Sequence, residues 1–162
     1  MSLEIARLSY EVSKSQLVNQ KEDLKNLRNQ ASFCAAITGL IGTVFASLGT
    51  SLTLESFTSR IGLLNDGFEG LFVVLTFAMS ICFSILVMTT WRKCTFDFDV
   101  NWILAQNELG RTDEDILIQL SKDADKYFNE NERVLDETKD NLWWSLVLSW
   151  CQIPAWILLL LT

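Results

Sequence analysis

Long apolar stretches alternate with charged segments along this chain of 162 residues. Three stretches, residues 31–54, 70–91 and 141–162, contain no Asp, Glu, Lys or Arg. A helix rises 1.5 Å per residue and needs about 20 apolar residues to cross the hydrocarbon core of a bilayer, so each stretch is long enough. A chain this short could not bury three such helices in a soluble core. The pattern therefore predicts three transmembrane helices and no cleaved leader, because a charged segment precedes the first stretch.

The basic residues predict how the chain is oriented in the membrane. Of the 13 Lys and Arg residues, only Arg60 falls in the short segment 55–69, and the other twelve lie in segments 1–30 and 92–140. Cytoplasmic flanks of membrane proteins are enriched in Lys and Arg. We therefore expect a cytoplasmic N-terminus, a short outer loop at 55–69, and a C-terminus on the far side.

The N-terminal segment 1–30 is predicted to be one cytoplasmic helix, because residues 3–28 contain no Gly or Pro. Apolar side chains recur in a heptad pattern that is typical of a narrow seam facing a partner helix. The pattern continues into the first apolar stretch without a helix breaker, which predicts one continuous helix. Its positions are Leu3, Tyr10, Leu17, Leu24 and Ala31, with Leu27 and Cys34 at the second heptad position.

Small residues follow a regular step inside the first apolar stretch. They are Ala35, Gly39, Gly42, Ala46 and Gly49, separated by four, three, four and three residues. Apolar side chains gain little by leaving lipid for one another, so close backbone approach along small residues is a main source of helix association in membranes. The step predicts a packing face whose partner is either another helix of the chain or a neighbouring subunit.

Segment 92–140 is expected to hold an extended connector followed by helices. Residues 95–100 alternate in polarity, and we expect an unpaired connector with Phe96 and Phe98 packed beneath the bilayer. Gly110 should end a short helix, and Thr112 with Asp115 is a capping-box signature for a helix from Asp113 to at least Asp140.

The 113–140 helix carries an apolar stripe that includes one polar residue. The polar residue, Asn131, is expected to fix the register between helices. This stripe should pack against the N-terminal helix, giving an all-α integral membrane protein with two long cytoplasmic helices in a coiled-coil-like bundle. The stripe positions include Leu117, Leu120, Ala124, Tyr127, Phe128, Val134, Leu135 and Leu142.

The third apolar stretch contains two residues that are unusual in a span. Pro154 removes a backbone hydrogen bond and should bend the helix. Gln152 is strongly polar and should seek a partner in lipid. Two interpretations stay open for it: an interhelical hydrogen bond, or the lining of a pore.

The composition excludes several kinds of chemistry. The chain has no His, and it lacks a phosphate-binding glycine loop, a nucleophile elbow and zinc-ligand spacing. Its net charge of −7 argues against nucleic acid as a partner. Residues 113–115 are best explained as helix N-terminal charge, and Asp97 with Asp99 as a solvated connector, although their spacing could bind a cation. We expect no catalytic residue, metal or cofactor, and we read Cys34, Cys82, Cys94 and Cys151 as packing residues.

One family resemblance accompanies this layout. The heptad helix LSYEVSKSQLVNQKEDLKNLRNQAS (Leu8 to Ser32), the small-residue span and the motif Phe96-Asp97-Phe98-Asp99 resemble small bacterial membrane proteins, and more loosely the SLATT-type membrane effectors of anti-phage systems. The resemblance covers roughly the first hundred residues in layout, and the third span departs from the two-span SLATT pattern. It implies residence in the bacterial inner membrane, assembly into homo-oligomers, and membrane disruption when a companion protein senses infection.

Two functional hypotheses follow. The first is a non-enzymatic homo-oligomer that forms or gates a membrane lesion. The second is a membrane anchor or scaffold whose cytoplasmic helices recruit a partner protein. Neither assigns a binding residue beyond the helix-packing positions named above.

Overall fold

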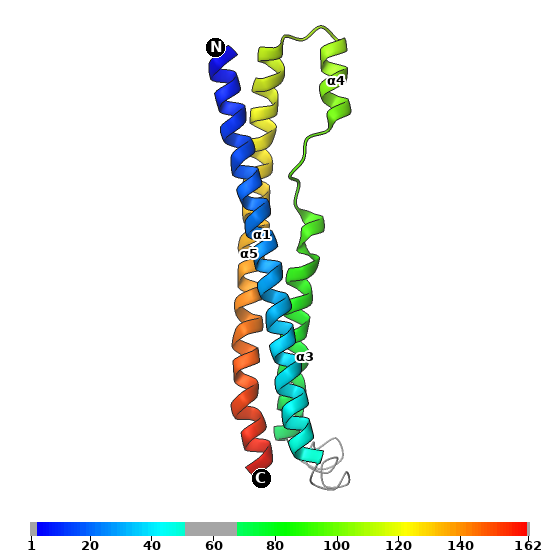
Figure 1. Ribbon diagram of the computed structural model, residues 1–162, viewed down its shortest axis with the longest axis vertical. Coiled ribbons are helices and arrows are strands. Elements are labelled where there is room, and N and C mark those ends of the chain that lie inside the picture. The colour runs from blue at the N-terminus through cyan, green and yellow to red at the C-terminus, as the bar shows by residue number, and fades with distance from the viewer. Residues whose placement is uncertain (1–2, 51–67, 162) are drawn as a thin grey trace. The chain divides into compact units, whose positions relative to one another are not determined.

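A computed structural model of the chain describes residues 3–50 and 68–161, and within them all side chains except those at 49–50, 68–70, 91–92 and 159–161. The described residues are helical apart from short connections (Figure 1). The elements are α1 (Leu3–Thr50), α3 (Phe68–Thr89), the 3-10 helix η1 (Thr90–Lys93), α4 (Val100–Glu108) and α5 (Asp113–Leu161). The expected outer loop at 55–69 falls mostly outside the described residues.

Two of these helices are long and unbroken. α1 has 48 residues and joins the predicted cytoplasmic helix to the first apolar stretch, as the heptad pattern predicted. α5 has 49 residues and likewise joins segment 113–140 to the third stretch, which agrees with a helix predicted to reach at least Asp140. The helix continues through Pro154, because a proline costs one hydrogen bond that a long packed helix can lose without ending.

The chain divides into two compact units. Unit 1 comprises residues 1–26 and 90–137, and unit 2 comprises residues 27–89 and 138–162. Each unit thus takes part of α1 and part of α5, and the two are described separately below.

In unit 1, α1 and α5 run parallel. The hydroxyls of Ser9 and Ser121 lie 2.6 Å apart, and farther along Gln20 Nε2 donates to the carbonyl of Phe128 at 3.0 Å. The seam also holds buried apolar side chains, as periodicity predicted for Leu17, Leu24, Leu120 and Ala124. Leu3 is an exception, since half of its surface is exposed and the seam begins only at Ala6.

The connector between η1 and α5 is ordered by local signals in the sequence. Asp99 caps α4, its carboxylate accepting from the backbone N–H of Asn101 at 2.9 Å. Gly110 adopts φ 74°, a left-handed conformation that favours glycine after a helix end. Thr112 and Asp115 form the start of a capping box: Thr112 Oγ1 accepts from the Asp115 backbone N–H and donates to its carboxylate. These features confirm the predicted ends of both helices.

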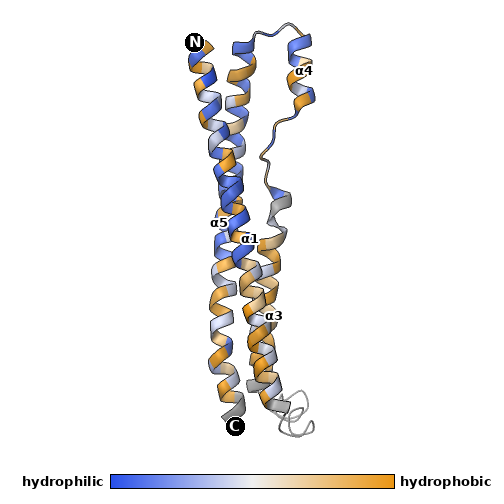
Figure 2. Cartoon of the chain, in the orientation of Figure 1, coloured by the Kyte–Doolittle hydropathy of each residue, from blue (hydrophilic) through white to orange (hydrophobic). Residues whose placement is uncertain are grey.

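Unit 2 is a bundle of α1, α3 and α5, in which α3 runs antiparallel to the other two. Thr38 lies against both Ser80 and Ser149, while Ser84 lies against Ser145. One apolar cluster contains Ala31, Cys34, Val87 and Leu142, and a second contains Val73, Ala155 and Trp156 with Phe45 stacked on Trp156 at 5.8 Å. Figure 2 shows α3 coloured as hydrophobic over most of its length.

Two helices among the described residues are long and apolar enough to cross a membrane, α1 over Leu3–Leu48 and α3 over Leu71–Thr89. The expected third span, 141–162, is not among them. Tryptophans, Ser145, Ser149 and Gln152 lower its mean hydropathy, and the side chains of its last leucines lie outside the described set. The first two predictions of apolar spans therefore stand by length and composition, and the third span is not shown by the described residues.

Candidate functional site

Hydroxyl side chains from three helices meet along the inside of unit 2. α1 contributes Thr38, α3 contributes Ser80 and Ser84, and α5 contributes Ser145 and Ser149. We call these five residues the hydroxyl ladder. All are buried, because the spacing of four residues in α3 and in α5 returns each hydroxyl to the same face of its helix.

The hydroxyl ladder is joined by short contacts. Thr38, Ser80 and Ser149 form a triangle with oxygen separations of 2.7, 2.8 and 3.2 Å, and one turn away the hydroxyls of Ser84 and Ser145 lie 2.7 Å apart. Ser145 also reaches the carbonyl of Ser80 at 3.1 Å, and Ser80 reaches that of Ser145 at the same distance. Each hydroxyl has one proton to donate and two lone pairs that can accept. The five hydroxyls therefore have more close oxygen neighbours than protons, and a hydroxyl can donate to a different neighbour without any side chain moving away.

Unit 2 consequently buries polar side chains beside its two apolar clusters and exposes large apolar side chains. Its outward positions are large hydrophobic side chains such as Phe33, Leu40, Leu71 and Trp150, whose exposure reaches 70%. Only 17% of the apolar window in α1 and 28% of that in α3 is buried. Exposed apolar surface of this extent is unfavourable in water and favourable in lipid, whereas hydroxyls in lipid must pair with each other.

Beyond the hydroxyl ladder, α5 buries two polar groups that it does not satisfy. Gln152 has no exposed surface, and neither its amide nitrogen nor its oxygen has a hydrogen-bond partner among the described residues. The indole nitrogen of Trp156, one turn later, is in the same condition. The predicted interhelical hydrogen bond of Gln152 is thus not formed within this part of the chain, and Pro154 beside it is exposed.

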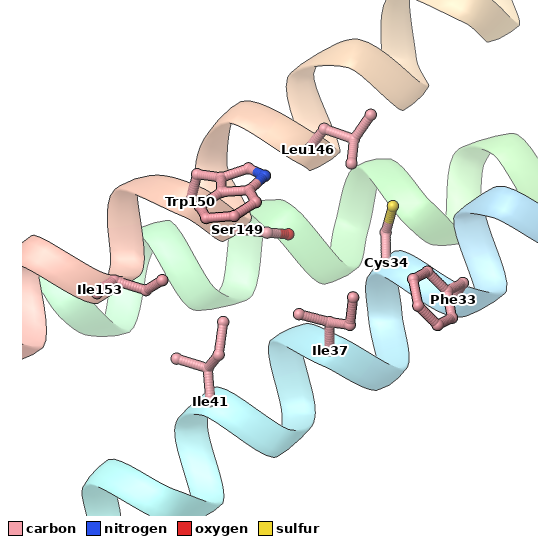
Figure 3. A pocket seen from close by; sticks show the side chains of 8 residues that line it. All are labelled: Phe33, Cys34, Ile37, Ile41, Leu146, Ser149, Trp150 and Ile153. Carbon is pink, nitrogen blue, oxygen red and sulfur yellow. The ribbon is translucent and has the colours of Figure 1, made fainter.

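An apolar groove runs between α1 and α5 in unit 2 (Figure 3). It encloses about 290 Å³ and is lined by Phe33, Cys34, Ile37, Ile41, Leu146, Ser149, Trp150 and Ile153. Ser149 is the only residue in this lining with a polar hydrogen-bonding side chain apart from the Trp150 indole, and its hydroxyl is engaged in the ladder. The groove can therefore accept hydrocarbon but offers little to a polar ligand.

The small residues of α1 differ from one another in their surroundings. A Cβ on Gly42 would lie 2.9 Å from the ring of Phe77, so α1 and α3 approach closely there, whereas a Cβ on Gly39 would meet nothing within 4 Å. Ala35 is half-buried, and Ala46 packs against the cluster around Val73. Gly49 belongs to α1, but its surroundings lie outside the described set.

The predicted seam residues differ in their surroundings: Leu17, Leu24 and Leu120 are buried, whereas Tyr127 contacts Phe98 of the connector. Leu117, Tyr127 and Phe128 are half-buried, and Leu27 packs on the first apolar cluster of unit 2. Asn131 is buried but does not pair with another helix. Its amide exchanges two hydrogen bonds with the main chain of Thr95, so it holds the connector rather than setting a helix register.

Reactive chemistry is sparse among the described residues. No group of three or more Cys, Asp or Glu side chains is arranged to hold a metal ion there. All four cysteines are free thiols, and burial raises the pKa of Cys94. Asp97 pairs with Lys21 at 3.6 Å on the surface. In the sequence, the only sign of the hydroxyl ladder is the four-residue spacing of Thr76, Ser80 and Ser84, which is also common in ordinary helices.

Comparison of the chain with models of protein families, with curated proteins and with solved structures finds no match.

Proposed function

We propose that the chain is an integral membrane protein that acts without catalysis, by assembling with copies of itself to form or gate a lesion in the bilayer. The observation that carries this proposal is the distribution of polar and apolar side chains in unit 2. Five hydroxyls and the Gln152 amide are buried beside the apolar clusters, and large apolar side chains cover the outside. In this proposal α1, α3 and the C-terminal part of α5 are the three spans, with the N-terminus in the cytoplasm and the C-terminus outside.

A single copy is closed along the hydroxyl ladder. Direct contacts of 2.7–3.2 Å between Thr38, Ser80 and Ser149 leave no space for water between them. Conduction therefore requires the three helices to separate, so that hydroxyls that now face each other face water. Assembly supplies the remaining wall, because three helices are too few to surround an aqueous path.

The resemblance to SLATT-type effectors suggests where such a lesion is useful. A protein that depolarises the inner membrane of an infected bacterium stops phage production by stopping the cell. We carry this role over as part of the proposal, with the lesion as the mechanism and a companion protein as the source of the signal.

The test begins with membrane potential. Inducible expression in bacteria, alone and with the products of neighbouring genes during infection, should collapse the signal of a potential-sensitive dye. Absence of depolarisation under all of these conditions would overturn the proposal that the chain forms a membrane lesion.

A second measurement tests which residues line the proposed lesion. Starting from a variant without native cysteines, Ser149→Cys should react with a membrane-impermeant thiol reagent only when the membrane is leaky. Leu40→Cys should stay unreactive, because Leu40 is 65% exposed on the outer face and would be covered by lipid. Depolarisation without labelling at position 149 would show that the hydroxyl ladder is not the lining.

The alternative, a membrane anchor or scaffold, is favoured by one feature of unit 1. Ile5, Leu8 and Val12 follow a three- and four-residue step along α1, and each has more than half of its surface exposed. Such a strip suits a partner helix. Native mass spectrometry of the detergent-extracted protein separates the two functions, since a stoichiometric foreign partner supports the anchor and a ring of identical chains supports the effector.

A further inference from the structure

A small pocket in unit 1 combines aromatic rings with carboxylates. It encloses about 210 Å³ and is lined by Phe98, Asp99, Trp102, Leu120, Asp123 and Tyr127. We infer that this pocket binds a small organic cation of the methylated ammonium class, such as a choline-like group. The inference concerns unit 1 alone and does not depend on the proposed membrane lesion.

The pocket is built by three separate segments that converge. Phe98 and Asp99 come from the connector, Trp102 from the first turn of α4, and Leu120, Asp123 and Tyr127 from α5. In α5 the steps of three and four residues place the last three side chains on one face. Leu120 is the one lining residue that is fully buried.

The aromatic rings provide the kind of surface that organic cations prefer. Phe98 lies between Tyr10 and Tyr127, with ring centres 5.8 and 6.4 Å away, and Trp102 adds the ring type that binds cations best. The same cluster already holds one cation, because Lys14 Nζ lies 5.9 Å from the centre of the Tyr10 ring. The pocket itself contains no Lys or Arg among its lining residues, so no described side chain of that kind lines it.

Charge favours a cation and disfavours an anion. One oxygen of Asp99 caps α4 and one of Asp123 accepts from Gln119 at 3.0 Å, which holds both carboxylates in place. Unit 1 as a whole has ten Lys and Arg against sixteen Asp and Glu residues, so its field attracts cations. Two carboxylates surrounded by rings are a poor cage for Mg²⁺ or Ca²⁺, which require more oxygen ligands. A methylated ammonium uses both features, since its methyl groups contact the rings and its charge faces the carboxylates.

The test compares a cation with its neutral isostere. The full chain, purified in a maltoside detergent, is titrated with choline and with 3,3-dimethylbutan-1-ol and followed by calorimetry and saturation-transfer NMR. We expect choline to bind with a dissociation constant on the order of millimolar and the neutral alcohol to bind roughly fivefold or more weakly. Equal binding of the two compounds, or no choline binding at tens of millimolar, would overturn the inference.

Two variants with matched controls locate the site. Trp102→Leu keeps an apolar side chain but removes the ring, and Asp123→Asn removes one charge; each should weaken choline binding roughly fivefold. Trp143→Leu and Asp125→Asn change exposed residues outside the pocket and should leave binding unchanged. Equal loss in the pocket variants and the controls would place the binding elsewhere. Circular dichroism of each variant checks folding, and if Trp102→Leu loses helix, Asp123→Asn decides.

The same cationic group occurs in free amines and in phospholipid headgroups. Repeating the titration in nanodiscs of phosphatidylcholine and of phosphatidylglycerol distinguishes these sources. Competition that appears only in phosphatidylcholine identifies a headgroup as the occupant, whereas equal affinity in both lipids identifies a free amine.

Discussion

The amide of Asn131 binds both main-chain groups of Thr95. Thr95 N donates to Asn131 Oδ1 at 3.0 Å, and Asn131 Nδ2 donates to the Thr95 carbonyl at 2.8 Å. Asn131 is 1% exposed and Thr95 lies at the surface, so these bonds are partly buried. The Asn131 side chain thus supplies the hydrogen bonds that a neighbouring strand would otherwise give to the main chain of Thr95.

Replacing Asn131 should therefore release the connector. Asn131→Leu leaves the two Thr95 groups without this partner and should destabilise unit 1 by about 1–3 kcal/mol. Hydrogen exchange of residues 94–99 measures the effect directly. Asn129→Leu is the control, because the exposed Asn129 bonds only to the carbonyl of Asp125 in its own helix. Equal protection of the connector in both variants would contradict the role assigned to Asn131.

The seam between α1 and α5 in unit 1 should depend on its buried leucines. Leu17 and Leu24 are at most 1% exposed, and burying a leucine is worth roughly 2 kcal/mol. Leu17→Asp with Leu24→Asp should separate the helices and collapse the folded form in detergent, while membrane insertion persists. Leu8→Asp is the control, since Leu8 is 62% exposed. Size-exclusion chromatography and protease resistance report the change, and an unaltered double variant would mean that the two helices are independent arms.

The register between these helices has its own test. The hydroxyls of Ser9 and Ser121 are 2.6 Å apart, so Ser9→Cys with Ser121→Cys should form a disulfide under mild oxidation once native cysteines are replaced. Ser9→Cys with Lys122→Cys should cross-link poorly, because Lys122 is exposed. A reversed preference would require a different register.

Gly42 and Gly39 should respond differently to the same change. Gly42→Ala places a methyl group 2.9 Å from Phe77, whereas Gly39→Ala places one in open space. We expect Gly42→Ala to lower stability in detergent by about 1 kcal/mol, within the range for overpacking, and Gly39→Ala to have little effect. Thermal unfolding of the monomer compares them. If Gly39→Ala alone abolishes oligomers, the open space at Gly39 is a contact between copies.

The buried side chain of Gln152 should destabilise the folded chain. Both polar atoms of its side chain are buried without a partner among the described residues, which is expensive in a medium of low dielectric constant. Gln152→Leu should therefore stabilise the chain by about 1–3 kcal/mol, measured by denaturant titration in detergent. Under the proposed function the same variant should depolarise membranes less, because it removes a polar group from the lining. Destabilisation instead would show that Gln152 has a partner in the folded protein.

The sequence alone determined the features that depend on local spacing. The heptad repeat identified Leu17, Leu24, Ala31 and Cys34 as buried, because a helix returns a side chain to the same face every seven residues. The Thr112 capping box and the left-handed Gly110 were also predictable, since each arises within a few residues of chain.

Only the tertiary structure decided which distant groups meet. Nothing in the sequence pairs Asn131 with Thr95, 36 residues away, rather than with another helix. The hydroxyl ladder needs three helices at one level before its scattered Ser and Thr residues become neighbours. Likewise, Gly39 and Gly42 belong to the same regular series of small residues in the sequence, but only Gly42 lies close to a ring on α3. Spacing along one helix fixes a face, whereas the partner of that face is fixed by the packing of the others.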